Sequence, residues 1–262
     1  MRGLLLDLDG VFYQNDAMIA GAADVLDWIV IHGIPHLFIT NTTSKPRGAI
    51  CDKLAAMGMW VTPDQILSPP VAAAHWLRER VNEAAALFMP AATQQEFEGL
   101  RLWSGAEIDA VGAVVIGDLA DAWNFDRLNE AFRLLMRTPA PALIALGMTR
   151  YWRTAAGLQM DVGPFVKALE YASGVAPVVL GKPSAAFFQT ATDMLGLDPG
   201  QVLMIGDDIR GDIDGAQQAG IAGALVRTGK FRAEDMESGV RPAVLLDSIA
   251  DLPRWWDQHL DS

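Results

Sequence analysis

Two short apolar segments, one near the N-terminus and one in the last third of the chain, both end in aspartates. Leu4-Leu5-Leu6 is followed by Asp7-Leu8-Asp9-Gly10, and Met204-Ile205-Gly206 is followed by Asp207-Asp208, with Asp212 close behind. Short apolar segments bounded by turn residues predict interior strands of a parallel sheet. In open α/β sheets, ligands bind outside the carboxyl ends of such strands. If the two strands are neighbours, these aspartates therefore share one crevice.

A crevice with several carboxylates needs a cation. At a separation of a few Å and an effective dielectric of about 20, each like-charge pair costs roughly 4 kcal/mol. Ligands that are all hard oxygens favour Mg²⁺. We interpret Asp207 as the natural metal ligand, and Asp208 and Asp212 as direct ligands or as holders of metal-bound water. The alternative for this segment is a loop whose aspartates cap a helix.

Composition bounds the class of protein. The 262 residues, 51% of them hydrophobic, suffice for one large α/β domain or two smaller ones. No segment approaches the roughly 20 apolar residues of a membrane span, and no signal peptide is visible, so we expect a cytoplasmic protein without a membrane partner. The formal charge of −12 argues against a nucleic-acid surface. The single cysteine, Cys51, lies in a predicted helix and cannot form an internal disulfide.

The order of apolar segments predicts a doubly wound parallel sheet built from both ends of the chain. We expect strand, helix, strand and helix at 4–8, 22–32, 36–39 and 46–57. Beyond residue 183 we expect a helix at 185–195, a strand at 202–205, a helix at 212–219 and strands at 222–226 and 243–246. This alternation is typical of α/β folds. Residues 1–69 and 179–262 are predicted to form one such core.

Residues 70–178 are predicted to form a smaller α/β cap domain inserted into that core. Strands are expected at 86–89, 111–116 and 142–145, and helices at 125–136 and 162–172. Structureless loops beyond about 15 residues are uncommon in compact domains, which favours a folded cap. The prolines at 69–70 and 177–183 are the expected hinges. The strand 111–116 could lie at a sheet edge and pair with a second copy, which would give a homodimer.

Asp7 and Asp9 are candidates for catalysis. With a side-chain period of two, the two carboxylates would share one face, unless the chain is already turning at this point. An ionised Asp7 could act as a nucleophile without an activating base. Asp9 could then protonate the leaving group and deprotonate the water that follows. The alternative is a simple hairpin turn, because Asp-Gly is a strong turn signal.

Two further strand ends carry polar groups. Thr40-Asn41 close the second expected strand and could either cap the next helix or hydrogen-bond a phosphoryl oxygen. Lys182 follows the apolar segment 178–180 and precedes Pro183. It is either a solvated surface charge or a cation that offsets the repulsion between Asp7 and an anionic substrate. A phosphate-binding P-loop at this lysine is excluded, since it would need Ser or Thr at position 183.

These four segments match, in order, the motifs of the haloacid dehalogenase (HAD) superfamily of phosphohydrolases. The insertion between the second and third motif resembles the type-II cap of subfamily IIA. The resemblance covers essentially the whole chain. It is strongest at 161–171, 205–217 and 226–231, which are similar to the phospholysine phosphohistidine inorganic pyrophosphate phosphatase branch and its HAD-like domain-containing relatives.

The resemblance implies a role for each matching residue. Asp7 would form an aspartyl-phosphate, with Asp9 as general acid and base. Mg²⁺ would be bound by Asp7, the Asp9 backbone carbonyl and Asp207. The phosphate would be held by Thr40, Asn41 and Lys182. The implied substrate is a small phosphorylated metabolite or pyrophosphate.

The resemblance is weaker in part of the cap. Residues 84–123 do not follow the pattern of the pyrophosphate-cleaving branch closely, so the resemblance does not transfer a particular substrate. Residues 158–164, Gly163 above all, are expected to form the lip that meets the substrate.

Two other functions fit the same residues. One is a regulatory protein that binds phosphate or metal without turnover, although such a protein has no need of Asp9. The other is a phosphotransferase whose acceptor is not water.

Overall fold

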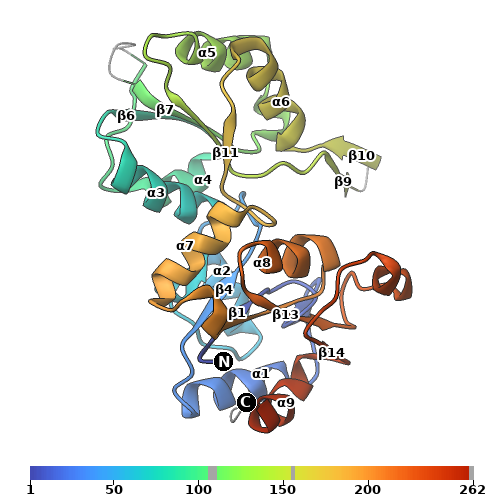
Figure 1. The fold of residues 1–262 in the computed structure, drawn as a ribbon. Coiled ribbons are helices and arrows are strands. Elements are labelled where there is room, and N and C mark those ends of the chain that lie inside the picture. The colour runs from blue at the N-terminus through green and yellow to red at the C-terminus, as the bar shows by residue number, and fades with distance from the viewer. Residues whose placement is uncertain (106–110, 155–156, 260–262) are drawn as a thin grey trace. The chain divides into compact units, whose positions relative to one another are not determined.

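A computed structural model describes residues 1–105, 111–154 and 157–259 (Figure 1). Contacts divide the chain into two compact units. The core unit comprises Met1–Thr40, Arg47–Leu67 and Lys182–Ser262, and the inserted unit comprises Asn41–Pro46 and Ser68–Gly181. The sequence predicts a catalytic core at 1–69 and 179–262 and a cap at 70–178. These roles stay predictions, because compactness does not give either unit a role.

The described part of the core unit contains a six-stranded parallel sheet with the order β14-β13-β12-β1-β4-β5. The two strands at its centre, β12 and β1, are buried along their whole length, as expected where helices cover both faces of a parallel sheet. The predicted doubly wound α/β fold is confirmed. The strands are β1 (Gly3–Leu6), β4 (His36–Ile39), β5 (Ile66–Leu67), β12 (Val202–Gly206), β13 (Ala222–Val226) and β14 (Val244–Leu246).

Helices with one apolar face pack on this sheet. In α1, the residues Ala22, Val25, Leu26 and Ile29 are buried, which is the spacing of one helix face. They join Leu4 and Leu6 in one hydrophobic cluster, and α1 also contacts α9. Helix α7 packs on β4 and on α8. The helices of the core unit are α1 (Ala22–Ile31), α2 (Arg47–Ala56), α7 (Ala185–Leu195), α8 (Gly215–Gln218) and α9 (Leu252–His259), with 3₁₀ turns at Pro63–Gln65, Pro199–Gln201, Ala233–Glu237 and Ile249–Asp251.

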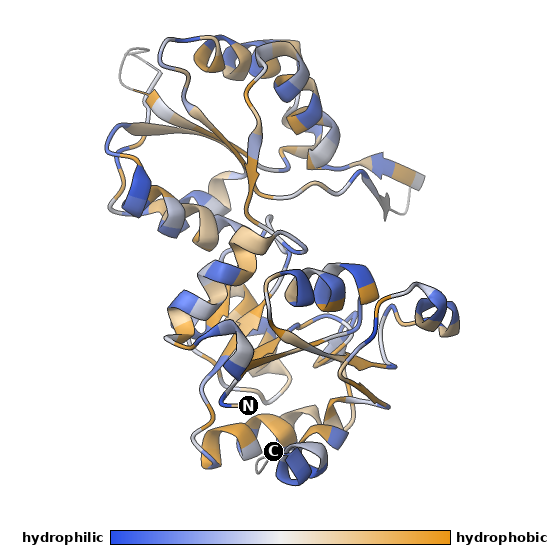
Figure 2. Cartoon of the chain, in the orientation of Figure 1, coloured by the Kyte–Doolittle hydropathy of each residue, from blue (hydrophilic) through white to orange (hydrophobic). Residues whose placement is uncertain are grey.

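The inserted unit has a parallel sheet of its own, with the order β11-β8-β7-β6. Its core joins apolar side chains of β7 and β8 to the buried faces of α5 and α6, and Trp123 stacks on Phe88 and on Phe165. The strands are β6 (Ala84–Phe88), β7 (Val111–Ile116), β8 (Ala142–Ala145) and β11 (Pro177–Val179), and the helices are α3 (Pro69–Arg80), α4 (Ala91–Gln94), α5 (Phe125–Leu135) and α6 (Val162–Ser173), with 3₁₀ turns at Gln95–Phe97 and Ala120–Ala122. Figure 2 shows hydrophobic residues along the strands of both units and mixed colours along the helices.

The prediction that strand 111–116 lies at a sheet edge is wrong. This segment is β7, which pairs with β6 on one side and β8 on the other. Its unbroken apolar sequence is that of an interior strand, because an edge strand is usually interrupted by charged residues. Pairing through this strand therefore no longer supports a homodimer, which stays a prediction.

The segment 212–219, predicted as one helix, has a different structure. The chain forms a π-helical segment over Ile209–Asp214, and the α-helix that follows, α8, covers only Gly215–Gln218. Both Asp212 N–H and Ile213 N–H donate to the carbonyl of Asp208, which widens the turn.

Several elements were not predicted from the sequence. They are α3, which begins at the expected hinge Pro69-Pro70, α4, α9, β5, and the antiparallel hairpins β2–β3 (Tyr13–Gln14, Ala17–Met18) and β9–β10 (Tyr151–Thr154, Gly157–Met160). Proline at the first helical positions favours a helix start, since its missing N–H has no partner there in any case. Within the described residues, every helix is too short or too polar to cross a membrane.

Candidate active site

The candidate site lies at the carboxyl ends of β1 and β12. These strands pair in parallel, with Leu6 opposite Ile205, so the residues that follow them emerge side by side. The N–H of Asp7 donates to the carbonyl of Ile205 over 2.9 Å and continues this pairing by one residue. The acidic residues therefore follow neighbouring strands of the sheet, as the sequence predicts.

Three carboxylates meet there. Asp7, Asp207 and Asp212 each offer one oxygen atom, and these three atoms lie within 4.8 Å of one another. All three residues are buried, with exposed fractions of 6% for Asp7 and 1% for each of the others. Buried like charges at this distance repel strongly, so the cluster requires positive charge nearby.

Lys182 supplies part of that charge. Its Nζ lies 2.7 Å from Asp7 Oδ1 and 2.7 Å from Asp212 Oδ1. It also donates to the carbonyl of Ile39 over 3.4 Å. Burial by itself would lower the pKa of Lys182, but the Asp212 and Asp7 carboxylates outweigh it and raise this pKa above its ordinary value. Lys182 is thus a buried ammonium group in the site, and the alternative of a solvated surface charge is wrong.

One ammonium group does not balance three carboxylates. Burial raises the pKa of Asp207 to about 6, and the neighbouring Asp212 adds to the effect. Burial also raises the pKa of Asp212 to about 6, against the opposing influence of Lys182. The pKa of Asp7 is raised as well, mainly by burial. Because the pKa values of all three carboxyl groups are raised, a further positive charge would stabilise their ionised forms.

Mg²⁺ fits this cluster. The Oδ1 atom of Asp207 is buried and has no hydrogen-bond partner among the described residues. Such an atom is rare in a folded protein and calls for an ion or water as its partner. The available donor atoms are all carboxylate oxygens, the ligands that Mg²⁺ prefers.

Asp208 stands apart from the three clustered carboxylates. Its Oδ1 accepts the backbone N–H groups of Arg210 and Gly211 at 3.0 and 2.8 Å, and its Oδ2 lies 3.3 Å from Lys230 Nζ. Although burial raises its pKa, the hydrogen bond from Gly211 and the charge of Lys230 lower it overall. Its Oδ1 thus caps the π-helical segment, as the capping alternative expects, while its Oδ2 pairs with Lys230, and a role of Asp208 toward a metal stays a prediction.

Asp9 lies on a turn beyond the end of β1. The strand ends at Leu6, and the carbonyl of Leu8 accepts N–H groups from Val11, Phe12 and Tyr13, so the chain is already turning. Gly10 has a φ of 86° within this turn. As a result Asp7 is buried while Asp9 is exposed. The strand alternation from which a shared face was expected therefore does not extend to Asp9, and its catalytic role stays a prediction.

The remaining predicted residues lie in different surroundings. Thr40 directly follows β4, is buried, and donates its N–H to the carbonyl of Leu67 over 3.0 Å. Asn41 is exposed and belongs to the inserted unit. Gly163 lies in the first turn of α6, where an added Cβ would come within 2.6 Å of Met148 O. Close packing thus accounts for this glycine, and its contact with a substrate stays a prediction.

Residues 228–230 follow β13 and lie in the stretch 226–231 that resembles the family, but no role was predicted for them. The N–H of Lys230 donates to Asp207 Oδ2 over 2.7 Å, and Thr228 Oγ1 donates to the carbonyl of Gly10. Their position directly after the apolar strand 222–226 was the available signal, because β13 is the neighbour of β12.

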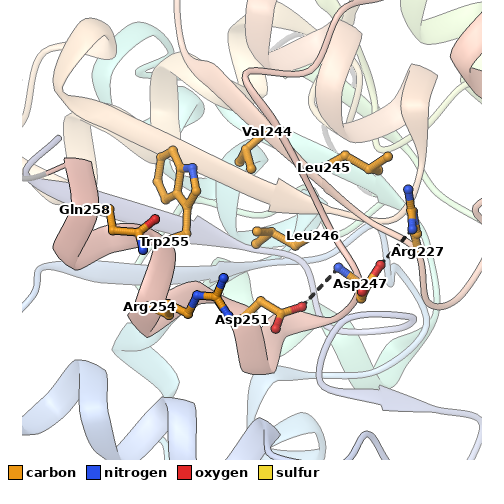
Figure 3. A pocket seen from close by; sticks show the side chains of 9 residues that line it. All are labelled: Arg227, Val244, Leu245, Leu246, Asp247, Asp251, Arg254, Trp255 and Gln258. Carbon is orange, nitrogen blue, oxygen red and sulfur yellow. Dashed lines mark hydrogen bonds and ion pairs between the residues drawn. The ribbon is translucent and has the colours of Figure 1, made fainter.

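A separate hollow of about 310 Å³ lies in the core unit between β14 and α9 (Figure 3). Three of its charged residues contact one another: Arg227 pairs with Asp247 over 2.8 Å, and the N–H of Asp247 donates to Asp251 Oδ2 over 3.1 Å. None of the three clustered carboxylates lines this hollow. This hollow is therefore separate from the carboxylate cluster.

Comparison with known families agrees with this site. The model described as "Haloacid dehalogenase-like hydrolase" matches residues 4–101, and the one described as "HAD-hyrolase-like" matches residues 179–252. The two matches contain Asp7 and Asp207, respectively. The chain belongs to the haloacid dehalogenase superfamily.

Individual relatives narrow the class. The chain is 35% identical over 266 residues to the human phospholysine phosphohistidine inorganic pyrophosphate phosphatase, covering 100% of this chain and 96% of the relative. It is 36% identical over 246 residues to the bovine haloacid dehalogenase-like hydrolase domain-containing protein 2, covering 94% and 91%. The solved p-nitrophenyl phosphatase from Archaeoglobus fulgidus superposes with a TM-score of 0.86 at 26% identity, covering 97% and 98%. The predicted family, fold and enzyme class, a HAD-type phosphatase, are confirmed.

Proposed function

We propose that the chain is a Mg²⁺-dependent phosphatase that hydrolyses a small phosphorylated metabolite or pyrophosphate through an aspartyl-phosphate on Asp7. The observation that carries the proposal is that the buried ammonium group of Lys182 contacts both Asp7 and Asp212, and that these two carboxylates form one cluster with Asp207. In this arrangement Asp7 is the nucleophile, and Lys182 is one of the positive charges that an incoming phosphate dianion requires.

In the first step, an Asp7 oxygen attacks phosphorus and the bond from phosphorus to the leaving oxygen breaks. Asp9 donates a proton to that oxygen. In the second step, Asp9 takes a proton from water, the water oxygen attacks phosphorus, and the Asp7–phosphorus bond breaks. The exposed position of Asp9 on the turn after β1 leaves its carboxylate accessible to a leaving group.

The other residues hold the phosphate and the charges. Lys182 lies against Asp7 and would contact a phosphoryl oxygen as it arrives, with Thr40 and Asn41 as the proposed hydrogen-bond donors. Mg²⁺ would be held by Asp7, Asp207 and the Asp9 backbone carbonyl, and it would neutralise phosphoryl charge during transfer. Asp212 would hold Lys182 in place, since the two groups lie 2.7 Å apart.

The inserted unit is proposed to act as the cap, with Gly163 near its substrate-facing lip. The relatives support the substrate class by their names, phospholysine phosphohistidine inorganic pyrophosphate phosphatase and p-nitrophenyl phosphatase. We propose a cytoplasmic enzyme that binds neither nucleic acid nor membrane, in keeping with a formal charge of −12. A homodimer stays a prediction.

The test is the Asp7→Asn variant, with Asp16→Asn as its matched control, because the Asp16 side chain is 98% exposed. We expect Asp7→Asn to abolish hydrolysis of p-nitrophenyl phosphate while circular dichroism remains that of the wild type. Asp16→Asn should keep full activity. Hydrolysis retained by Asp7→Asn would exclude the covalent mechanism.

A substrate panel separates the two other functions. Sugar phosphates, nucleotides, phosphoamino acids, phosphoamides and pyrophosphate are assayed with and without Mg²⁺. Binding without release of phosphate across the panel would indicate a regulatory protein. Transfer of the phosphoryl group to an added alcohol in preference to water would indicate a phosphotransferase.

A further inference from the structure

Residues 228–230, which we call the clamp, contact two parts of the carboxylate site at once. Thr228 Oγ1 donates a hydrogen bond to the carbonyl of Gly10, on the turn after β1. The N–H of Lys230 donates to Asp207 Oδ2, in the loop after β12. Since β1, β12 and β13 are consecutive in the sheet, the clamp ties together the ends of three neighbouring strands.

Two glycines permit this close approach. Gly10 and Gly229 have φ values of 86° and 68°, which favour glycine. A Cβ on Gly229 would lie 2.6 Å from the Cα of Gly10 and would collide with Asp207 Oδ2. A Cβ on Gly10 would collide with the same oxygen. Either side chain would therefore displace the Asp207 carboxylate.

The clamp fixes the orientation of that carboxylate. Its Oδ2 accepts the Lys230 N–H, while its Oδ1 stays buried without a hydrogen-bond partner among the described residues. The fixed group thus presents one unpaired oxygen to the cluster that also contains Asp7 and Asp212. The clamp's other contact holds the turn that follows Asp9.

We propose that the clamp positions the Mg²⁺ ligand Asp207 and the turn carrying the Asp9 carbonyl, an inference that rests on the Mg²⁺ site of the proposed function. Hydrogen bonds that orient a ligating carboxylate are commonly worth 10–100-fold in metal affinity. Thr228 and Gly229 are positioning residues, because neither offers the metal a side-chain ligand in this arrangement. Their loss should weaken metal binding more than a comparable loss elsewhere.

Two uncharged substitutions test the clamp, each with a matched control. Thr228→Val removes the hydroxyl group at nearly constant shape, and Thr190→Val removes a comparable bond to a backbone carbonyl, Ala186 O, within α7. Gly229→Ala places a methyl group against Asp207. Gly196→Ala adds the same group at a φ of 66°, where a Cβ meets nothing within 4 Å. Thr228→Ser, which keeps the hydroxyl group, is the rescue variant.

The readout is the Kd for Mg²⁺, measured by isothermal titration calorimetry on the full chain without substrate, with circular dichroism as the check on folding. We expect Thr228→Val and Gly229→Ala to raise this Kd about 10-fold or more. Thr228→Ser and both controls should keep the wild-type Kd, even where a control lowers the melting temperature. Equal Kd values for Thr228→Val and Thr190→Val, or for Gly229→Ala and Gly196→Ala, would overturn the proposal. Absence of Mg²⁺ binding by the wild type would refute the proposed metal site and this inference together.

Discussion

Replacement of Lys182 by methionine should be among the most destabilising single changes in the core unit. The side chain is 4% exposed, and its Nζ lies 2.7 Å from both Asp7 and Asp212. At an effective dielectric of about 20, each contact at this distance is worth about 6 kcal/mol of Coulomb energy. The desolvation of the charges offsets most of this, and breaking a buried pair costs about 3–5 kcal/mol in practice. We expect a loss of that size in the free energy of unfolding.

Lys167→Met is the matched control. Lys167 makes a contact of nearly the same length, 2.6 Å to Glu170, but the two side chains are 63% and 30% exposed. An exposed pair is worth at most about 1 kcal/mol, because water and side-chain entropy reduce it. Both variants are measured by urea denaturation of metal-free protein. The unfolding of the core unit is followed for Lys182→Met, and the unfolding of the inserted unit for Lys167→Met. Equal losses for the two variants would refute the reasoning from burial.

The pH dependence gives this prediction a second test. The pKa of Asp212, raised to about 6 mainly by burial, lies above its value in an unfolded chain. The folded state therefore binds more protons than the unfolded state in this window, and this group's contribution to stability falls as pH rises. Without Lys182 the pKa rises further. The cost of Lys182→Met should thus be smaller at about pH 5 than at about pH 7.5, and the reverse order would contradict the charge argument.

Three other outcomes are expected. Asp9→Asn, at an exposed position, should change stability by less than about 0.5 kcal/mol while lowering kcat about 10²–10⁴-fold; urea denaturation and steady-state kinetics check this, and unchanged kcat would exclude Asp9 as the acid. Gly163→Ala should destabilise by about 1–3 kcal/mol through its contact with Met148 O, whereas Gly48→Ala meets open space; equal melting temperatures would show that the packing is looser than described. Mg²⁺ at 100 times its Kd should add about 2.7 kcal/mol to the unfolding free energy of the wild type, and less at low pH because the pKa of Asp207 is about 6; calorimetric melting that is insensitive to Mg²⁺ would contradict this.

Local sequence carried much of the fold because parallel strands must be apolar throughout. The segments at 36–39, 111–116, 142–145 and 222–226 were predicted at the bounds of β4, β7, β8 and β13. The elements that were missed lack such a signal. The two-residue strand β5 is too short to show a period, and α3 begins with prolines that also fit a hinge.

Which strand lies beside which could not be read from the chain. The apolar sequence of 111–116 suits an edge poorly and an interior position well, yet only the pairing of β7 with β6 and β8 decides the matter. Strand order depends on contacts between residues far apart in sequence. Local propensity contains no information about them.

For the site, the sequence by itself indicated which residues to propose for the chemistry, because an ionisable side chain directly after a buried strand is costly to desolvate and is therefore typical of a functional site. Only the tertiary structure decided what each of these groups contacts and how far each is buried. It placed Asp212 against Lys182, turned Asp208 toward the backbone of the π-helical segment, exposed Asp9, and set the clamp after β13 on Asp207. The physical reason is that the roles of these groups depend on distances and burial between loops from different strands, which exist only once the sheet has formed.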